Sequence, residues 1–275
     1  MTLILIPGLA LAFLLGLLVG SLLNVCIYRW PRDESVVSPR SHCTSCDNTV
    51  AWYDNLPVLS YLLLGGRCRH CQAAIAPSYP IVELLNALFY AYIFWRYGID
   101  PVGFKLALFV SMMLVLVVTD WQEYILPDEI TIGGLVIGWA ISPFIHLDGG
   151  PLRLPLLLFE KQYPPWVVSV MESFAAAIVI GGFLFVLGEV YFRLRKIEGL
   201  GFGDVKMVAM MGAFWGFGDT FMTLILGSML GSVVGISIVL LARKGWNYAL
   251  PFGSYLGATA IVVALWGDDI VNWYL

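Results

Sequence analysis

Two aspartates lie at the ends of long apolar segments, where a carboxylate can do chemistry. Asp120 ends one segment, and Asp204 follows the glycines of residues 199–203 between two others. Two carboxylates that lie close together cannot both ionise comfortably, so they share a proton. The ionised carboxylate can take a proton from water, and the protonated one can polarise a scissile carbonyl. Such a pair indicates aspartyl-protease chemistry, which needs no metal, serine or cysteine.

Each aspartate also has a structural interpretation. Asp204 can be only the N-cap of a helix, and Asp120 only the polar flank of a membrane segment. A shared role is favoured because each lies beside a helix-breaking element. Ile125-Leu126-Pro127 follows Asp120, and glycines precede Asp204. We therefore predict that the two carboxylates meet.

The glycines around Asp204 resemble a nucleotide-binding loop. No strand precedes Gly199 and no βαβ unit surrounds it, so the sequence context excludes that interpretation. We expect Gly201 and Gly203 to give the backbone the freedom with which Asp204 approaches a substrate strand. Lys206 either tunes the carboxylate pair, contacts an anionic group or extends its ammonium to the membrane interface.

Two Cys-x-x-Cys pairs, 21 residues apart, predict a metal site between the first two apolar segments. Four thiolates at this spacing are typical of a closed, structural zinc site. Iron and a pair of disulfides are the alternatives, and a cytoplasmic position, where thiols stay reduced, favours metal. We expect Asn55, between the pairs, to cap a short helix. The predicted ligands are Cys43, Cys46, Cys68 and Cys71.

The elements that position these residues are membrane helices. The chain of 275 residues is 60% hydrophobic and only 12% charged. Its apolar runs are continuous and do not alternate, which favours helices over a β-barrel. We predict an all-α polytopic membrane protein with about eight transmembrane helices and a Pro-rich linker at residues 147–165. The predicted helices cover residues 3–28, 81–95, 104–120, 129–145, 167–192, 204–215, 220–241 and 251–266.

We divide the chain into a first transmembrane helix (residues 1–28), a cytoplasmic zinc-binding loop (29–80) and a helix bundle (81–275). In the seventh predicted helix, Gly227, Gly231 and Gly235 form two successive Gly-x-x-x-Gly units. Such units predict tight packing against another helix, either of the same chain or of a second copy. A homodimer is therefore left open.

The basic residues orient the chain in the membrane. With eight crossings, eleven Lys and Arg residues fall on one side and four on the other. The side with the excess is cytoplasmic, so both termini face outward. The same crossings place Asp120 and Asp204 together at the cytoplasmic face, although the count of Lys and Arg residues uses neither aspartate. The eleven are Arg29, Arg32, Arg40, Arg67, Arg69, Arg193, Arg195, Lys196, Lys206, Arg243 and Lys244, and the four are Arg96, Lys105, Arg153 and Lys161.

These motifs together resemble the type IV prepilin peptidases. The resemblance rests on Gly-x-Gly-Asp-x-Lys at residues 201–206, on Asp120 with Leu-Pro-Asp at 126–128, and on the paired Cys-x-x-Cys motifs. The segments at residues 20–31 and 79–83 are also similar to the family. Ser78 and Trp30 depart from its pattern, where a basic residue and a leucine are usual. Ser78 lies near what the resemblance implies is the methyl-transfer region.

The resemblance implies two reactions at the cytoplasmic side of the cell inner membrane. The enzyme would cut the basic leader from type IV prepilins or pseudopilins after a glycine. It would then methylate the new N-terminal amine, with S-adenosylmethionine as methyl donor. Asp120 and Asp204 would be the catalytic pair, supported by Gly201, Gly203 and Lys206. The implied partners are these protein substrates and membrane lipid, with no nucleic acid.

The residues of methyl transfer are harder to identify from the sequence. Polar residues inside membrane segments are functional candidates by default. Asn24 and Glu83 lie near the cytoplasmic ends of the first two helices, beside the cysteine loop, and Glu83 can orient the substrate amine or the cofactor's ammonium. For Asn24 and Asn86 the alternative is hydrogen bonding between helices. For Asp128 and Glu129 we favour helix capping.

Two other functions fit parts of the sequence. A peptidase without methyl transfer would resemble the archaeal preflagellin peptidases, but those relatives usually lack the cysteine loop. A small ion- or proton-coupled transporter predicts internal repeats and charges near mid-membrane. The sequence has no convincing repeat, and its two key aspartates lie at one face. The bifunctional enzyme is therefore the favoured prediction.

Overall fold

The computed structural model describes residues 2–145, 147, 163–196, 199–241 and 250–274. Within these residues every regular element is a helix, apart from two isolated β-bridges in the cysteine loop. The predicted all-α class is therefore confirmed. The Pro-rich linker at residues 147–165 lies almost entirely outside the described residues. The chain forms two compact units, Met1–Val115 and Leu116–Leu275.

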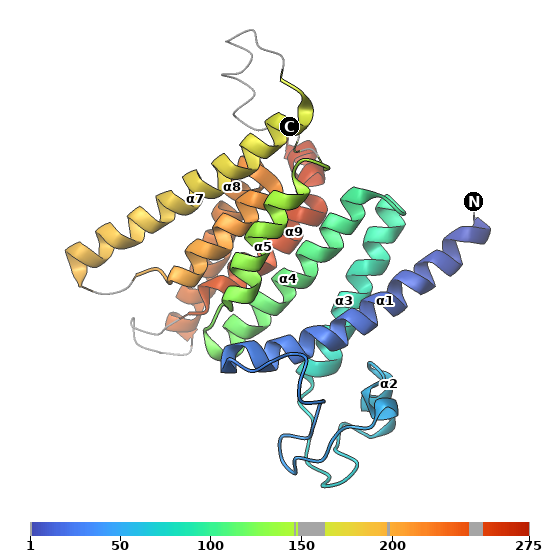
Figure 1. The fold of residues 1–275 in the computed structure, drawn as a ribbon. Coiled ribbons are helices and arrows are strands. Elements are labelled where there is room, and N and C mark those ends of the chain that lie inside the picture. The colour runs from blue at the N-terminus through green and yellow to red at the C-terminus, as the bar shows by residue number, and fades with distance from the viewer. Residues whose placement is uncertain (1, 146, 148–162, 197–198, 242–249, 275) are drawn as a thin grey trace. The chain divides into compact units, whose positions relative to one another are not determined.

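Two long helices of the first unit, α1 and α3, pack along each other (Figure 1). A Cβ atom at Gly16 would lie 2.5 Å from Ala87 Cα, and one at Gly20 would lie 2.7 Å from Glu83 Cα. Small residues allow such a close backbone approach between membrane helices. The elements of this unit are, in chain order, α1 (Thr2–Arg29), η1 (Trp30–Arg32), η2 (Trp52–Asn55), α2 (Leu59–Leu63) and α3 (Ser78–Tyr97), followed by most of α4 (Pro101–Glu123).

The short helix α2 begins later than the sequence suggested. Its N-cap is Val58, which has a positive φ of 60°, so the prediction that Asn55 caps this helix was wrong. The reason is Pro57, which disfavours helical backbone at the preceding residue. Leu56 is accordingly extended, with ψ at 120°. Asn55 instead ends the 3-10 helix η2.

The second unit is built around its longest helix, α8, which packs against α5, α7 and α9 (Figure 1). Small residues again set the distance between helices. A Cβ at Gly212 would lie 2.8 Å from the backbone nitrogen of Ala177, and one at Gly181 would lie 3.0 Å from the Cβ of Ala209. The helices that lie wholly in this unit are α5 (Asp128–Ile141), α7 (Pro165–Arg195), α8 (Phe202–Leu241) and α9 (Phe252–Tyr274).

The sixth and seventh predicted helices are joined in α8, which is broken at Gly216. This residue has a φ of 73° and a ψ of −160°, a conformation that glycine adopts far more readily than other residues. Helix α7 supplies side chains at the break. Ser173 Oγ donates to the Ala213 carbonyl at 2.6 Å, and Glu172 Oε1 accepts from the Phe217 N–H at 3.5 Å. Backbone groups left unpaired by the break thereby gain partners.

Five of the described helices are long and apolar enough to cross a membrane, namely α1, α4, α7, α8 and α9. The predicted multi-pass membrane protein is confirmed at this level, but the count of eight crossings is not. Helix α5 has 14 residues, which span about 21 Å of a hydrocarbon core about 30 Å thick. Helix α3 has 20 residues and is also not among the five.

The Gly-x-x-x-Gly units of α8 face a helix of the same chain. A Cβ at Gly227 would lie 3.1 Å from Leu256 Cδ1, and one at Gly231 would lie 3.6 Å from Tyr255 Cδ2. Both contacts are with α9. These glycines therefore give no support for a homodimer, which stays a prediction.

Candidate active site and metal centre

Three helix ends meet at Gly253, in the first turn of α9. Asp120 comes from the last turn of α4, and Asp204 from the first turn of α8. A Cβ at Gly253 would lie 3.1 Å from Asp120 Cγ and 3.1 Å from Asp204 Oδ1. The two carboxyl groups are therefore separated by no more than twice that distance. The structure brings together the two aspartates that the sequence placed about eighty residues apart.

Asp120 is held by two hydrogen bonds to one of its oxygens. Its side chain is buried, and Oδ2 accepts from both the backbone N–H of Ser254 at 2.6 Å and the Ser254 hydroxyl at 2.8 Å. Ser254 lies in the first turn of α9, where N–H groups lack partners within the helix and carry partial positive charge. The N-terminus of α9 therefore stabilises a negative charge on Asp120.

Asp204 is buried as well, but it lacks the pair of serine hydrogen bonds that Asp120 has. It is the third residue of α8, so it lies inside the first turn rather than at the N-cap. Its backbone N–H donates to the Gly201 carbonyl at 3.1 Å. Its Oδ1 atom is buried and has no hydrogen-bond partner within the described part of the chain. A buried oxygen of this kind is costly unless it has a function or binds water or substrate.

Gly201 and Gly203 contribute space rather than an unusual backbone. Neither has a positive φ angle, so the expected conformational freedom is not used in this structure. A Cβ at Gly201 would instead lie 3.0 Å from Asp204 Oδ2, and one at Gly203 would lie 3.0 Å from the Cβ of Leu126. The two glycines therefore allow Asp204 and its helix to approach their neighbours.

Lys206 pairs with a third carboxylate, that of Asp128. Its ammonium forms an ion pair with Asp128, the first residue of α5, and lies 5.1 Å from the ring centroid of Phe202. Contact with an anionic group was one of the predicted roles. Asp128 and Glu129 begin α5 as predicted, and acidic residues in a first turn favour the helix dipole, but neither is the N-cap, which is Pro127 with no side-chain capping bond. The ion pair joins α8 to α5 at the end of the bundle that holds Asp204.

The four predicted metal ligands form one cluster in the first unit. Their sulfur atoms all lie within 4.8 Å of one another, and the Cys43 and Cys71 sulfurs are 3.7 Å apart. Tetrahedral zinc, with Zn–S bonds of about 2.3 Å, requires sulfurs about 3.8 Å apart. Backbone N–H groups of Cys71 and His70 lower the pKa of the Cys68 thiol to about 6, whereas burial and the neighbouring thiols raise the pKa of the Cys71 thiol to about 11. The cluster therefore fits a four-coordinate metal ion.

Each Cys-x-x-Cys pair lies in the same type of turn. The Cys43 N–H donates to the Asn48 carbonyl at 2.9 Å, and the Asp47 N–H donates to the Cys43 carbonyl at 2.9 Å. Asp47 takes a left-handed conformation, with a φ of 55°. The second turn repeats both bonds and the left-handed residue with Cys68, Ala73 and Gln72. Two equivalent turns thus present two sulfur atoms each.

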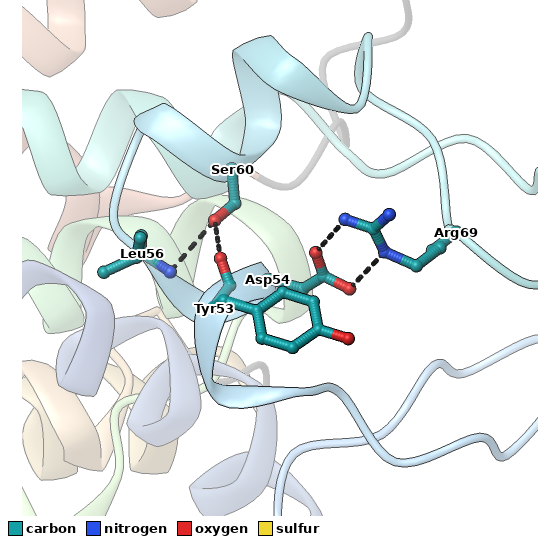
Figure 2. Close-up of polar contacts among 5 residues, drawn as sticks. All are labelled: Tyr53, Asp54, Leu56, Ser60 and Arg69. Carbon is teal, nitrogen blue, oxygen red and sulfur yellow. Dashed lines mark hydrogen bonds and ion pairs between the residues drawn. The ribbon is translucent and has the colours of Figure 1, made fainter.

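A separate set of polar contacts holds the chain between the two turns (Figure 2). Arg69 lies between the cysteines of the second pair, and its Nε and Nη2 atoms donate to the two oxygens of Asp54 at 2.8 and 2.6 Å. The hydrogen-bonded guanidinium holds the pKa of the Asp54 carboxyl below its usual range. The Ser60 hydroxyl donates to the Tyr53 carbonyl at 2.9 Å and accepts from the Leu56 N–H at 3.0 Å. These bonds tie η2 to α2 and to the second cysteine turn.

Asn24 and Glu83 meet between α1 and α3, next to the cysteine loop. Asn24 Nδ2 donates to Glu83 Oε1 at 3.5 Å and to the Tyr79 carbonyl at 3.0 Å. Glu83 is buried, and its Oε2 atom accepts from the Val58 N–H at 2.7 Å. Glu83 thus binds Val58, the residue with positive φ at the start of α2. The bonds of Asn24 match the alternative prediction of hydrogen bonding between helices.

Sequence reasoning missed Gly253 and Ser254. A signal was present, because these residues start the last apolar segment directly after Pro251. The predicted crossings also put that start on the same side as both aspartates. No feature of the sequence showed that its backbone N–H and hydroxyl would reach Asp120, since the two residues are 134 positions apart.

Two family profiles match the chain. Residues 14–97 match the bacterial Peptidase A24 N-terminal domain, and residues 107–236 match the type IV leader peptidase family. The first match contains all four cysteines with Asn24 and Glu83. The second contains Asp120 and Asp204. No solved structure matches this chain.

Curated relatives from several bacteria carry the name "Prepilin leader peptidase/N-methyltransferase". The relative from Pseudomonas putida is 34% identical over 285 residues, which cover 94% of this chain and 91% of the relative. The relative from Aeromonas salmonicida strain A449 is 34% identical, covering 97% of this chain and 93% of the relative. The relative from Pseudomonas aeruginosa is 30% identical, covering 95% and 91%.

Replacing Cys43 with serine should release metal from the purified protein. Serine lacks the thiolate, so one of the four ligands is lost. Elemental analysis of the purified protein measures the result, with Cys26→Ala as a matched control because Cys26 is buried in α1, outside the cluster. Equal metal content in the wild-type and Cys43→Ser proteins would contradict a site at these four cysteines.

Proposed function

The chain belongs to the type IV leader peptidase family, and on this premise we propose that it is a bifunctional membrane enzyme of prepilin processing. It cleaves the basic leader of type IV prepilins or pseudopilins after a glycine and then methylates the new N-terminal residue. The observation that carries the proposal is the meeting of Asp120 and Asp204 at Gly253, where a Cβ atom would lie 3.1 Å from each carboxyl group. Burial of both groups lets them act on a substrate away from bulk water.

The carboxylate pair supplies the chemistry of peptide cleavage. The ionised carboxylate takes a proton from a water molecule, whose oxygen attacks the scissile carbonyl carbon. The protonated carboxyl group donates its proton to the carbonyl oxygen as the tetrahedral intermediate forms. Collapse of that intermediate returns a proton to the leaving nitrogen and breaks the C–N bond. Gly201 and Gly203 allow the approach of Asp204, and Lys206 with Asp128 joins α8 to α5 beside it.

The enzyme lies in the cell inner membrane, with the carboxylate pair at the cytoplasmic face and both termini outside the cytoplasm. The eight predicted crossings and the excess of Lys and Arg residues on one side support this orientation. The apolar helix of the prepilin enters the bilayer beside the helix bundle at residues 81–275. Its leader junction then reaches the membrane edge where α4 ends and α8 and α9 begin.

The four cysteines of the loop at residues 29–80 hold zinc in a structural role. Four sulfur ligands leave no open coordination position for catalysis. The two equivalent turns and the sulfur spacing support zinc, and iron is the alternative. When bound, the metal fixes the two turns to each other, so that the loop keeps its shape beside Glu83.

The second reaction uses S-adenosylmethionine as methyl donor, and Glu83 with Asn24 is the proposed binding site. A buried carboxylate between α1, α3 and the cysteine loop can orient a cationic group, either the substrate amine or the ammonium of the donor. The cysteine loop favours this bifunctional enzyme over a peptidase without methyl transfer. A proton-coupled transporter is disfavoured, because the carboxylate pair lies at helix ends rather than near mid-helix.

Asp120→Asn and Asp204→Asn should each abolish leader cleavage. Either change removes one of the two groups that move protons, so the rate should fall by roughly 10²- to 10⁴-fold. The measurement is mass analysis of a purified prepilin incubated with each variant. Both variants should insert in the membrane and keep their metal, since the cysteines lie in the other compact unit. Normal processing by either variant would exclude the pair as the catalytic centre.

Gly253→Ala should also impair cleavage. The added methyl group would lie 3.1 Å from both carboxyl groups and 3.0 Å from Leu126 Cδ1, so these neighbours must shift by a few tenths of an ångström. Overpacking of this kind should lower the cleavage rate by about tenfold or more. The matched control is Gly231→Ala, whose methyl group would meet no atom closer than 3.6 Å. Equal activity of the two variants would show that space at Gly253 is not needed.

Glu83→Gln separates the two proposed reactions. Glutamine can still accept the Val58 N–H but carries no charge, so methyl transfer should fall by about tenfold while leader cleavage continues. The assay follows labelled methyl groups from S-adenosylmethionine into the cleaved pilin. Glu189→Gln is the control, because Glu189 is exposed and pairs with Arg193 on α7. Unchanged methylation by Glu83→Gln would leave Glu83 with a structural role only.

A further inference from the structure

The two carboxylates at Gly253 are not equivalent. Asp120 Oδ2 accepts two hydrogen bonds from a single residue, Ser254, at 2.6 and 2.8 Å. Asp204 Oδ1, which faces the same glycine, has no hydrogen-bond partner among the described residues, and the Asp204 carboxylate receives a single backbone hydrogen bond, from Gly201. Two donors aimed at one oxygen stabilise the ionised form of a carboxylate, whereas a buried oxygen without donors favours the protonated form.

We infer that Ser254 is a positioning residue that makes Asp120 the base and Asp204 the acid of the pair. This inference rests on the proposed peptide cleavage and assigns its two proton-transfer roles. The N-terminus of α9 contributes as well, because the Ser254 N–H belongs to its first helical turn. The assignment follows from the placement of α9, whose Ser254 donates twice to Asp120.

The Ser254 hydroxyl can serve Asp120 both before and after proton transfer. Its oxygen lies 2.8 Å from Asp120 Oδ2 and 3.1 Å from the carbonyl oxygen of Val117. A hydroxyl has one proton to donate and two lone pairs that accept. Before the reaction it donates to the ionised Asp120. Once Asp120 is protonated, the hydroxyl can accept from it and turn its own proton to Val117.

The proton count of the assigned step is balanced. Asp120 takes one proton from water as the water oxygen bonds to the scissile carbon, and Asp204 gives its proton to the carbonyl oxygen. When the C–N bond breaks, the proton on Asp120 passes to the leaving nitrogen. The hydroxyl proton of the intermediate returns to Asp204 as the carboxylic acid product forms. Both aspartates then regain their starting states.

Ser254→Ala tests the assignment by removing one donor to Asp120. We expect kcat for prepilin cleavage to fall by about tenfold, with KM unchanged, because the group acts on the chemical step rather than on binding. Ser254→Thr keeps the hydroxyl and should restore most of the rate. Ser237→Ala is the matched control, since Ser237 is partly exposed on α8 and its hydroxyl donates to the Val233 carbonyl of its own helix.

A wild-type rate for Ser254→Ala, or a change confined to KM, would overturn the inference while leaving the proposed function intact. A folded Ser254→Thr protein that is as slow as Ser254→Ala would also overturn it. A wild-type protein that leaves the prepilin uncut would overturn both the proposed function and the inference.

Infrared spectroscopy gives a second test, which needs no substrate and uses no variant of Ser254. Difference spectra of the full-length wild-type protein and its Asp→Asn variants show which aspartate holds the proton at rest. We expect Asp204→Asn to lose the band of a protonated carboxyl group and Asp120→Asn to keep it. Loss of that band in Asp120→Asn, or its persistence in Asp204→Asn, would overturn the assignment.

Discussion

The close approach of three helix ends at Gly253 is the contact on which the proposed catalytic site depends. A carboxyl group inside a membrane protein is costly unless other polar groups surround it. Here the cost is met by the N-terminal turn of α9, whose N–H and hydroxyl reach Asp120. The absence of a side chain at Gly253 lets Asp204 come equally near. A larger residue at position 253 would crowd the two carboxylates. Without Ser254 at the start of α9, Asp120 would lose both of these hydrogen-bond donors.

The rest of the second unit maintains this approach through small residues. Gly212 and Gly181 bring α7 and α8 together, and Gly227 brings α8 and α9 together. The hydrophobic effect does not drive helices together inside a lipid bilayer, so close van der Waals packing at small residues is a main source of their association. The break at Gly216 lets the first part of α8 differ in direction from the second. The position of Asp204 is therefore set by packing along the whole helix.

The cysteine loop is stabilised by polar contacts and by its sulfur cluster rather than by helix packing. It has little apolar core of its own, and it is held by two equivalent turns, by the bidentate Asp54–Arg69 pair and by the sulfur cluster. Glu83 connects this loop to the long helices, because its buried carboxylate accepts from the Val58 N–H at the start of α2. That connection gives Glu83 a structural task whatever its part in methyl transfer. It also explains how loop and helices can act as one compact unit.

The helical class, the four-cysteine cluster and the meeting of Asp120 with Asp204 could be predicted from the sequence, because continuous apolar runs, cysteine spacing and carboxylates at segment ends are local features. The sequence also placed the break near Gly216. It did not determine the count of crossings or the start of α2, where Pro57 overrides a plausible cap. The folded chain was needed to show that Gly201 and Gly203 provide space, that Lys206 pairs with Asp128, and that Ser254 holds Asp120. Those facts depend on which side chains face each other across helices, and one sequence carries no record of that pairing.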